Sequence, residues 1–194
     1  MRKLFIFLAL LFVAAIPTQA QENYPKAEVY GGFSFFNSGQ FPQRENLNSP
    51  GFGASIAGNL SKNFGIAGEV SGHFGTVTLL NLAGTPGVTV PEFDADVYTF
   101  LFGPRFTSRS GGFDIFGHVL VGGAKTQVEG FDSDTDFALA VGGGVDVIVS
   151  KPLAVRIIQI DYLPIKNDRS IFAGKDWSQN VRFQIGVVFR FGAE

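Results

Sequence analysis

The sequence contains no cysteine, so disulfide bonds and lipid attachment at a processed N-terminal cysteine are both excluded. Small secreted domains often depend on disulfides, and this chain must be stabilised in another way. Charged residues make up only 16% of the 194 residues, against about 25% in typical soluble domains. The formal net charge is −2, which gives no indication of a nucleic-acid partner.

Long apolar runs are also scarce. The clearest one, Leu4–Ile16, follows two basic residues and ends at Pro17. It is shorter than the roughly 20 residues that a membrane-spanning helix needs. A positive start, an apolar stretch and a short segment ending in Ala20 are typical of a secretory signal peptide. We therefore expect a cleaved signal peptide over residues 1–20 and one mature domain over residues 21–194.

Phenylalanine and glycine, by contrast, are abundant, with 22 and 25 copies. The clearest pattern that contains them is Val181–Phe191. Alternate positions of this segment are apolar or aromatic: Val181, Phe183, Ile185, Val187, Phe189 and Phe191. The positions between them are mostly polar or small: Arg182, Gln184, Gly186, Val188 and Arg190. Side chains alternate between the two faces of a strand. The segment therefore predicts a strand whose apolar face lies either in a soluble core or against lipid, as in a membrane barrel.

Seven earlier segments alternate in a similar way. The eight predicted strands are Ala27–Phe36, Gly51–Leu60, Phe64–Phe74, Val97–Thr107, Phe113–Lys125, Phe137–Val149, Leu153–Leu163 and Val181–Phe191. Their lengths are close to the roughly 9–11 residues that a tilted strand needs to cross a bilayer. Because no apolar run after Pro17 is long enough for a spanning helix, a membrane crossing by this chain would use strands.

The links between these strands alternate strictly in length. Three are short and turn-like: Ser61–Asn63, Ser108–Gly112 and Ser150–Pro152. Four are long and polar or irregular: Asn37–Pro50, Gly75–Asp96, Thr126–Asp136 and Pro164–Asn180. An up-and-down barrel with tight turns at one end and longer loops at the other produces this order. A soluble sandwich has no reason to sort its loops by length. We therefore expect an all-β fold, an eight-stranded antiparallel up-and-down transmembrane β-barrel.

Most strands separate large apolar side chains from polar or small ones. Small residues are expected on the inner faces because an eight-stranded barrel has little interior space. Gly142–Gly144 lies inside a strand and is interpreted as relief of crowding, not as a phosphate-binding loop. The strand Leu153–Leu163 is less regular, because Gln159 and Asp161 share one face and Arg156 falls on the other. Arg156 is expected either at the membrane edge or beside a β-bulge.

Charged side chains on the inner faces are predicted to form a lumen network: Glu69, Arg105, Asp146, Asp161, Arg182 and Arg190. Glu28 is expected to join them. Charges in a narrow interior must pair with one another. The network would be either a charged gate or proton path, or a salt-bridged plug. We favour the plug, because small eight-stranded barrels are usually packed inside.

The two histidines, His73 and His118, do not indicate a catalytic site. A hydrolase on this fold would need a nucleophile, a base and an orienting acid within reach of one another. Ser71 and Glu69 share a strand with His73, but one strand does not easily converge three side chains on one atom. No serine lies near His118. We expect no catalytic residues and no cofactor, and we interpret both histidines as interior side chains.

Asp132–Asp136 has the D-x-D-x-D spacing of a calcium-binding loop. Phe137 stands where such a loop needs glycine, and Gly143 stands where it needs glutamate. A solvated acidic loop is the simpler interpretation, and a loose divalent site near lipopolysaccharide is the alternative. We predict no metal site. The last long link holds basic and aromatic residues that we interpret as candidate surface contacts with lipid phosphates or a partner: Lys166, Arg169, Lys175 and Trp177.

Four pieces of the chain resemble small bacterial outer-membrane β-barrel proteins of the OmpA-like or OmpX-like, porin-like type: Phe102–Phe106, Gly142–Asp146, Gln159–Pro164 and Gly186–Gly192. The resemblance covers nearly the whole mature chain. It implies location in the bacterial outer membrane and contacts with outer-membrane lipid and lipopolysaccharide. It also implies insertion by the barrel assembly machinery, which reads an aromatic residue at the end of the final strand. Here three residues follow Phe191, which departs from that pattern.

The resemblance is specific for architecture and does not define an activity. We expect a non-enzymatic protein with a structural, envelope-integrity or surface-interaction role, acting through its four long loops, with its N-terminus on the periplasmic side. The first alternative is a narrow, low-conductance pore. The second is a secreted ligand-binding barrel, which would need an apolar interior and a polar exterior. The sequence does not indicate an oligomeric state.

Overall fold

The computed structural model describes residues 24–39, 48–78, 92–128, 133–166 and 177–192. The signal peptide predicted over residues 1–20 lies outside these ranges. The strands are β1 (Ala27–Gly39), β2 (Asn48–Asn59), β3 (Phe64–Thr78), β4 (Glu92–Arg109), β5 (Phe113–Val128), β6 (Asp134–Ser150), β7 (Leu153–Tyr162), β8 (Ile165–Lys166) and β9 (Trp177–Phe191). Among the described segments there is no helix long and apolar enough to span a membrane.

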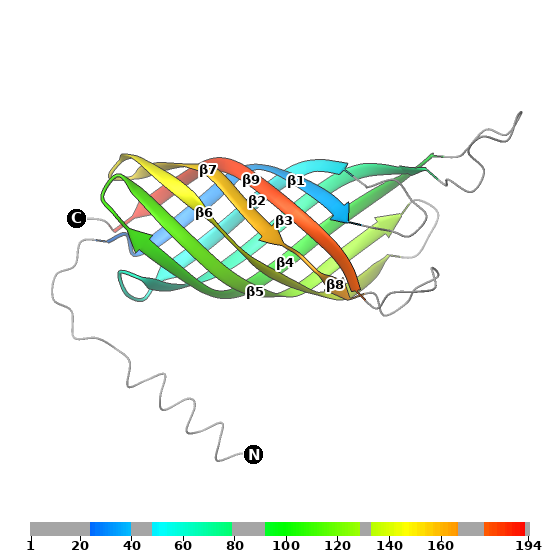
Figure 1. Cartoon of the computed structure of the whole chain (residues 1–194), viewed down its shortest axis with the longest axis horizontal. Helices are drawn as coiled ribbons and strands as arrows, with labels where there is room; N and C mark the ends of the chain where they lie inside the picture. The colour runs from blue at the N-terminus through cyan, green and yellow to red at the C-terminus, as the bar shows by residue number, and fades with distance from the viewer. Residues whose placement is uncertain (1–23, 40–47, 79–91, 129–132, 167–176, 193–194) are drawn as a thin grey trace, which may run out of the picture.

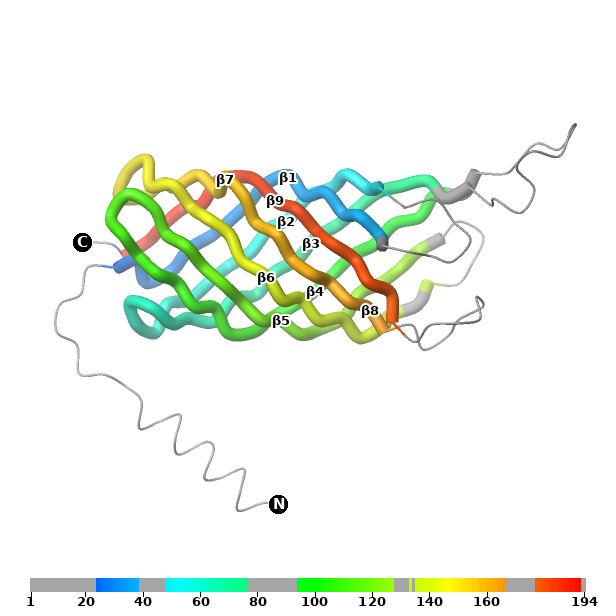
Figure 2. Tube along the Cα trace, viewed as in Figure 1, coloured from blue at the N-terminus to red at the C-terminus, as the bar shows by residue number. Residues whose placement is uncertain are grey.

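The strands form one closed antiparallel barrel (Figures 1 and 2). Each strand from β1 to β6 pairs with the next, β7 pairs with β9, and β9 pairs with β1. In the closing pair, Gly32 lies opposite Gly186 and Ala27 opposite Phe191. The short β8 pairs with both β6 and β9, so it continues the position of β7. The predicted eight-stranded antiparallel barrel is therefore confirmed, with β7 and β8 sharing one of its eight positions.

The two ends of the barrel differ. One end, termed the turn end, carries the three short turns and the described ends of the chain (Figure 1). The backbone N–H of Lys26 donates to the carbonyl of Phe191 there over 2.8 Å. Gly111, in the turn between β4 and β5, has a φ of 74°, a conformation that favours glycine. The opposite end, to which the four long links connect, is termed the loop end.

Several strands extend further toward the loop end than the sequence predicts. β3 ends at Thr78 instead of Phe74, and β4 begins at Glu92 instead of Val97. Thr78 and Glu92 lie opposite each other. β6 likewise begins at Asp134. The polar composition of these segments indicated loops, but strand pairing needs only backbone hydrogen bonds, and polar residues make them equally well. The predicted loop boundaries are therefore wrong by several residues.

The long link predicted over residues 164–180 also contains strand residues. β7 ends at Tyr162, and β8 begins at Ile165 just after Pro164, which has no N–H to donate. The carbonyl of Pro164 still accepts a hydrogen bond of 3.1 Å from the backbone N–H of Leu139. Proline therefore interrupts the strand without ending the wall of the barrel.

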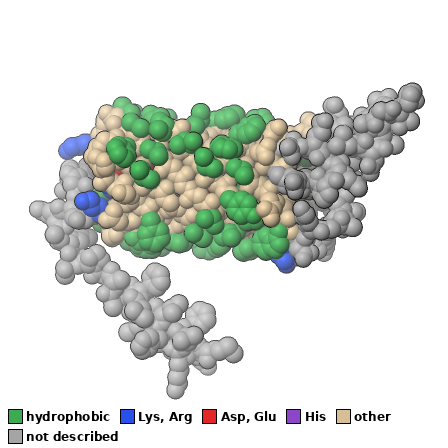
Figure 3. All heavy atoms as spheres, viewed as in Figure 1, with side chains coloured by type: hydrophobic (Ala, Val, Ile, Leu, Met, Phe, Trp, Pro, Cys, Tyr) green, Lys and Arg blue, Asp and Glu red, His purple; other side chains and the backbone are tan. Residues whose placement is uncertain are grey.

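The outer wall of the barrel is apolar. Large hydrophobic side chains are exposed on all eight long strands, with Phe102 at 63% and Ile56 at 61%. Figure 3 shows hydrophobic side chains spread over the wall between the two ends, with Lys and Arg only near the ends of this face. Buried polar and charged side chains line the interior. The predicted separation of faces is therefore confirmed, and it is the reverse of what a soluble ligand-binding barrel needs.

The crowded interior depends on small residues. Ala124, Ala138 and Ala140 are fully buried on the inner faces of β5 and β6. A Cβ atom on Gly142 would collide with the side chain of Asp161, and one on Gly144 would press against the ring of Phe116. These glycines therefore leave room for two side chains of the interior site described next.

Candidate functional site inside the barrel

A β-bulge in β7 turns Arg156 into the barrel. The pairing of β7 with both β6 and β9 shifts by one residue at Ile157 and Ile158. Both isoleucines consequently face outward, at 53% and 41% exposure, whereas Arg156 and Gln159 are 2% and 0% exposed. Of the two alternatives for Arg156, the bulge is confirmed and the membrane edge is wrong. The extra residue shifts the alternation by one position. Counting every second residue across the bulge therefore assigns side chains on its far side to the wrong face.

Arg182 lies at the centre of the charges in the middle of the barrel. Its buried guanidinium donates hydrogen bonds to Glu69 on β3 and to Asp161 on β7, the latter over 2.7 Å and 3.1 Å. It also donates to Ser71 Oγ over 3.1 Å. Arg182 and Asp161 are cross-strand neighbours on the paired strands β9 and β7, whereas the bonds from Arg182 to Glu69 and Ser71 on β3 cross the lumen. A guanidinium removed from water costs several kcal/mol unless it is paired, and here two carboxylates pair with it.

Gln159 connects the central carboxylates to a second arginine. Its Nε2 donates to Asp161 over 2.8 Å and to Glu69 over 3.2 Å. Its Oε1 accepts a hydrogen bond of 2.6 Å from Arg156. The other oxygen of Asp161 lies 2.8 Å from Nε2 of His118. A neutral side chain thus links two groups of charges without adding a charge of its own.

Arg156 and Arg105 share the carboxylate of Asp146. Arg156 binds it with two nitrogens, at 2.7 Å and 3.0 Å, and Arg105 approaches it at 3.3 Å. Arg105 also pairs with Glu28 at 2.9 Å. The ring of Phe116 lies 4.2 Å and 4.3 Å from the two guanidinium carbons, within the range of cation–π attraction. Forked arginine–carboxylate pairs are strong and directional, so this group has one well-defined arrangement.

The last charges lie at the turn end of the lumen. Arg109 is 3.0 Å from Glu28 and 2.8 Å from Asp114. Arg190 is 3.2 Å from the same Asp114 carboxylate, and its side chain is 11% exposed. Each of these arginines therefore contacts a carboxylate that is almost completely shielded from solvent.

Together these side chains form one connected set, termed the interior charge network: Glu28, Glu69, Arg105, Arg109, Asp114, Asp146, Arg156, Asp161, Arg182 and Arg190. Carboxylates and guanidinium groups are equal in number, so the formal charges balance. The network runs from the middle of the barrel to its turn end. Buried ion pairs gain little net stability over an apolar core, but removing one partner is costly. The network therefore favours a single packed interior.

The structure brings all six predicted lumen residues and Glu28 into this network. It also adds three residues that the sequence analysis did not assign to the network: Arg109, Asp114 and Arg156. Arg109 was expected in a turn, because β4 was expected to end at Thr107. Asp114 lies on the predicted inner face of its strand, so alternation was a sufficient signal for it. Alternation placed Arg156 on the outer face, because the bulge shifts the count by one residue.

The serine, histidine and acid considered as a triad have other partners. Nε2 of His73 lies 2.7 Å from Ser34 Oγ. Ser71 and Glu69 both accept hydrogen bonds from Arg182. A nucleophile that faces an arginine, and not the histidine, has no base to remove its proton. The triad of Glu69, Ser71 and His73 considered from the sequence is therefore not formed.

No metal site is found among the described residues: they contain no group of three or more His, Cys, Asp or Glu side chains suited to a metal ion. Of the acidic segment considered as a calcium loop, Asp134 and Asp136 belong to β6, and Asp132 lies outside the described residues. The part of this segment that the structure describes is therefore extended strand, not loop.

The basic and aromatic residues predicted as surface contacts are only partly within the described ranges. Lys166 ends β8 and Trp177 begins β9, and the two lie opposite each other at the loop end. Trp177 is 39% exposed, and its ring packs edge-on against Phe137 with 6.3 Å between centroids. Arg169 and Lys175 lie outside the described residues.

Comparison with known proteins gives a family and a set of similar folds. The model of a family described as the outer membrane protein beta-barrel domain matches residues 5–191. No curated protein matches the sequence.

Three solved structures illustrate the similar folds. Ail of Yersinia pestis, solved in complex with the heparin analogue sucrose octasulfate, is 16% identical, with 87% of this chain and 99% of that chain covered and a TM-score of 0.58. Neisserial surface protein A (NspA) is 11% identical over 88% of this chain and 100% of its own, with a TM-score of 0.64. OprG of Pseudomonas aeruginosa is 12% identical over 89% and 98%, with a TM-score of 0.60. At these identities the likeness concerns the fold alone.

Proposed function

Because the chain belongs to the outer membrane protein beta-barrel domain family, we propose that it is an integral, non-enzymatic protein of the bacterial outer membrane. Its barrel is a closed anchor, and its working surface is the loop end, where it supports envelope integrity or contacts a surface partner. The mature chain is residues 21–194, released from a signal peptide at residues 1–20. The barrel assembly machinery inserts it with the turn end in the periplasm.

The interior charge network carries this proposal. Its central layer joins Arg182 and its cross-strand neighbour Asp161 to Glu69 across the lumen, and all three side chains are at most 2% exposed. The interior of an eight-stranded barrel is just wide enough for its side chains, so a paired layer leaves no path for hydrated ions at that level. With the outer wall against lipid, the loop end is the surface that remains for recognition.

The favoured partner at the loop end carries phosphate or sulfate groups. Ail, which shares the fold, was solved with the heparin analogue sucrose octasulfate. This chain carries Lys166, Arg169 and Lys175 in the link that leads to Trp177. Basic residues near a membrane surface are attracted to anionic headgroups by about 1 kcal/mol each. These residues are therefore proposed to contact the phosphates of lipopolysaccharide.

Gel mobility of the protein from the outer-membrane fraction, with and without boiling in SDS, tests the anchor. A folded barrel resists SDS and migrates at a different apparent mass until it is heated. We expect a heat-dependent shift, and no discrete conductance steps from the wild-type protein in planar bilayers. Recovery in the soluble fraction without a shift would contradict the anchor and favour the secreted ligand-binding barrel.

Binding to lipopolysaccharide micelles tests the loop surface. Alanine replacement of Lys166, Arg169 and Lys175 should weaken binding, most clearly at low salt, and should raise the sensitivity of cells to detergent. Alanine replacement of Lys62 and Lys151, which are exposed in turns at the opposite end, is the control. Unchanged binding and detergent sensitivity in the loop variant would contradict the proposed contact.

A narrow pore is the second candidate, and one observation favours it. Ser49 Oγ and Gln184 Oε1 are buried without a hydrogen-bond partner among the described residues. Buried polar groups of this kind are usually satisfied by ordered water. If water fills the loop half of the lumen, the layer of Arg182, Glu69 and Asp161 is the barrier to ion passage in this half. Discrete conductance steps that change on replacing Glu69 or Arg105 would favour the pore over the closed anchor.

A further inference from the structure

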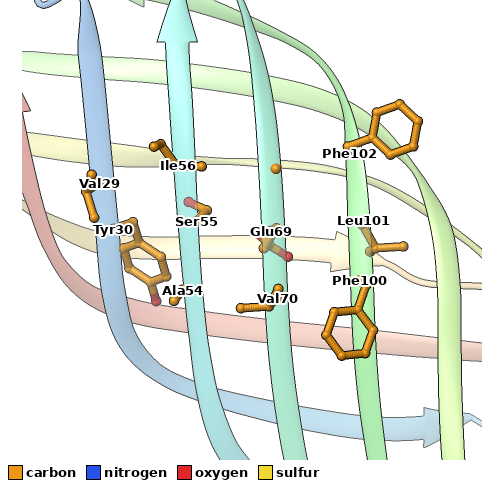
Figure 4. A pocket seen from close by; sticks show the side chains of 11 residues that line it. Val29, Tyr30, Ala54, Ser55, Ile56, Glu69, Val70, Phe100, Leu101 and Phe102 are labelled. Atoms are coloured by element: carbon orange, nitrogen blue, oxygen red, sulfur yellow. The ribbon is translucent and has the colours of Figure 1, made fainter.

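The outer wall formed by β1 to β4 has a groove that the proposed function does not use (Figure 4). Ala54 on β2 and Gly68 on β3 form its floor. Gly68 lies opposite Ile56 in one pairing and opposite Phe102 in the other. A Cβ atom on Gly68 would come near only one atom, Cγ2 of Ile56 at 4.0 Å. The groove is therefore open space that a larger outward side chain would fill.

Large apolar side chains rise on both sides of this floor. Phe100 and Phe102 project from β4 and are 58% and 63% exposed. Ile56 on β2 is 61% exposed, and Val29 on β1 is 38% exposed. Figure 4 shows the two phenylalanines on one side of the groove and the two aliphatic residues on the other. The space between them is about 540 Å³. The charged side chain of Glu69, whose backbone lines the groove, is buried in the interior. The groove therefore presents apolar side chains to its occupant.

Aromatic side chains on the same strands define the depth of the groove. Toward the loop end, the ring of Phe74 lies 6.2 Å from Phe52 and 6.0 Å from Tyr98. Toward the turn end, the rings of Phe64 and Phe106 are 5.1 Å apart. Girdles of aromatic residues mark the two interfaces of outer-membrane barrels. The groove lies between these groups, because Gly68 is closer along β3 to Phe64 and Val70, which pairs with Ala54, is closer to Phe74. It therefore lies at hydrocarbon depth.

We propose that this groove is a binding site for one acyl chain of a phospholipid. The proposal rests on the proposed membrane location and adds a specific lipid site to it. Burial of apolar surface gives no net drive here, because lipid tails are as apolar as the wall. The preference comes from packing: a chain in the groove touches the floor and both sides, whereas a chain on a flat wall touches one surface only.

The shape of the groove favours an acyl chain over a second copy of the barrel. Ala54 and Gly68 lie on adjacent strands about 4.8 Å apart and two register positions from each other, and Val70, which pairs with Ala54, lies beside them, so the floor is narrow. The phenylalanines beside it stand out from the wall. A second barrel has a convex wall of its own, which would rest on Phe100 and Phe102 and leave the floor empty. A flexible hydrocarbon chain fits between them.

Photo-cross-linking in lipid vesicles tests the site. The full mature chain is refolded into phosphatidylcholine vesicles that contain a small fraction of phosphatidylcholine with a diazirine in one acyl chain. Cross-linked residues are then identified by peptide mass spectrometry. We expect several-fold more label on the groove residues than on Val141 and Ile160, which lie on the opposite wall and are each 44% exposed. Even labelling of the two walls would overturn the proposal.

A pair of glycine variants gives the matched comparison. Gly68→Leu fills the floor, whereas Gly58→Leu adds the same side chain to the outer face of β2 at a position where a Cβ meets nothing within 4 Å and which is not part of the groove. Gly68→Leu should reduce the label on groove residues to the level of the opposite wall, and Gly58→Leu should leave it unchanged. Groove labelling that survives Gly68→Leu would overturn the proposal. In a separate sample treated with a bifunctional cross-linker, cross-links between two copies that Gly68→Leu abolishes would also overturn it, since they assign the groove to a dimer.

Heat-dependent gel mobility of each sample separates two kinds of failure. If wild-type protein shows the shift but labels evenly, the groove proposal fails and the membrane anchor stands. If wild-type protein shows no shift in vesicles, the proposed membrane function fails first, and the groove proposal fails with it. A Gly68→Leu variant that keeps the shift and loses the label supports the acyl-chain site.

Discussion

Replacing Arg182 by methionine should lower the free energy of unfolding of the barrel by about 3–5 kcal/mol, the usual cost of removing one partner from a buried ion pair. The side chains of Arg182 and Asp161 are 0% exposed and that of Glu69 is 2% exposed, so solvent does not screen the carboxylates that remain. Methionine keeps an unbranched side chain in the same space but donates no hydrogen bond. Two carboxylates would then lie in the lumen without the guanidinium that neutralises them.

A combined variant separates lost charge pairing from lost packing. Arg182→Met together with Glu69→Gln and Asp161→Asn removes the whole charged layer. It should recover most of the loss, because replacing a buried ionic group completely is often close to neutral. Lys151→Met changes an exposed charge in a turn and should alter stability by less than about 0.5 kcal/mol.

Urea titration of the refolded barrel in lipid vesicles measures these differences. Unfolding can be followed by emission from Trp177, the single tryptophan of the chain, and by the fraction that retains heat-dependent gel mobility. A loss below about 1 kcal/mol for Arg182→Met would refute the reasoning, because it would place the layer in a solvated environment like that of surface ion pairs. A combined variant no more stable than Arg182→Met would refute it too.

Further predictions address the bulge, the interior glycines and the lipid-facing wall. Deleting Ile157 should remove the bulge, so that the side chains of β7 on one side of the deletion point to the wrong face of the barrel, and should abolish the heat-dependent gel shift. Ile157→Val keeps the residue and should preserve the shift. Gly144→Val should destabilise the barrel by about 1–3 kcal/mol through overpacking, whereas Gly58→Val should have a much smaller effect, and equal losses in urea titration would argue against a crowded interior. Phe100→Arg should cost about 2–4 kcal/mol in vesicles, against about 0–1 kcal/mol for Phe191→Arg near the membrane edge, and similar values at both positions would contradict the proposed depth.

Much of the fold was predictable from alternation alone. Val181–Phe191 alternates without interruption, and β9 places its odd-numbered residues outward and its polar residues inward as expected. The family resemblance inferred from such segments is confirmed by the family match over residues 5–191. Alternation works here because each strand has one face against the interior and one against the outside, and the two environments demand different side chains.

The failures arise where pairing, not side-chain character, decides the structure. Thr78 and Glu92 are polar and were expected in a loop, yet they pair as neighbouring strand residues. Arg109 was expected in a turn for the same reason. Alternation placed Arg156 on the wrong face because one extra residue in β7 shifts the count. The irregular pattern left a bulge and the membrane edge as alternatives, and only the strand pairing decides between them.

Alternation along the chain specifies most of the wall of this protein: which side chains face outward, which face inward, and where the tight turns lie. That information is local, because the two faces of a strand repeat every two residues along the covalent chain. Which interior charges meet depends instead on how the strands assemble. Glu69 and Arg182 are separated by 113 positions, and they touch because β9 closes on β1 and because the register of every strand pair sets their heights in the lumen. A periodic pattern specifies the face on which a side chain lies. Which residue it meets across the lumen depends on the registers of all the strand pairs that lie between the two residues.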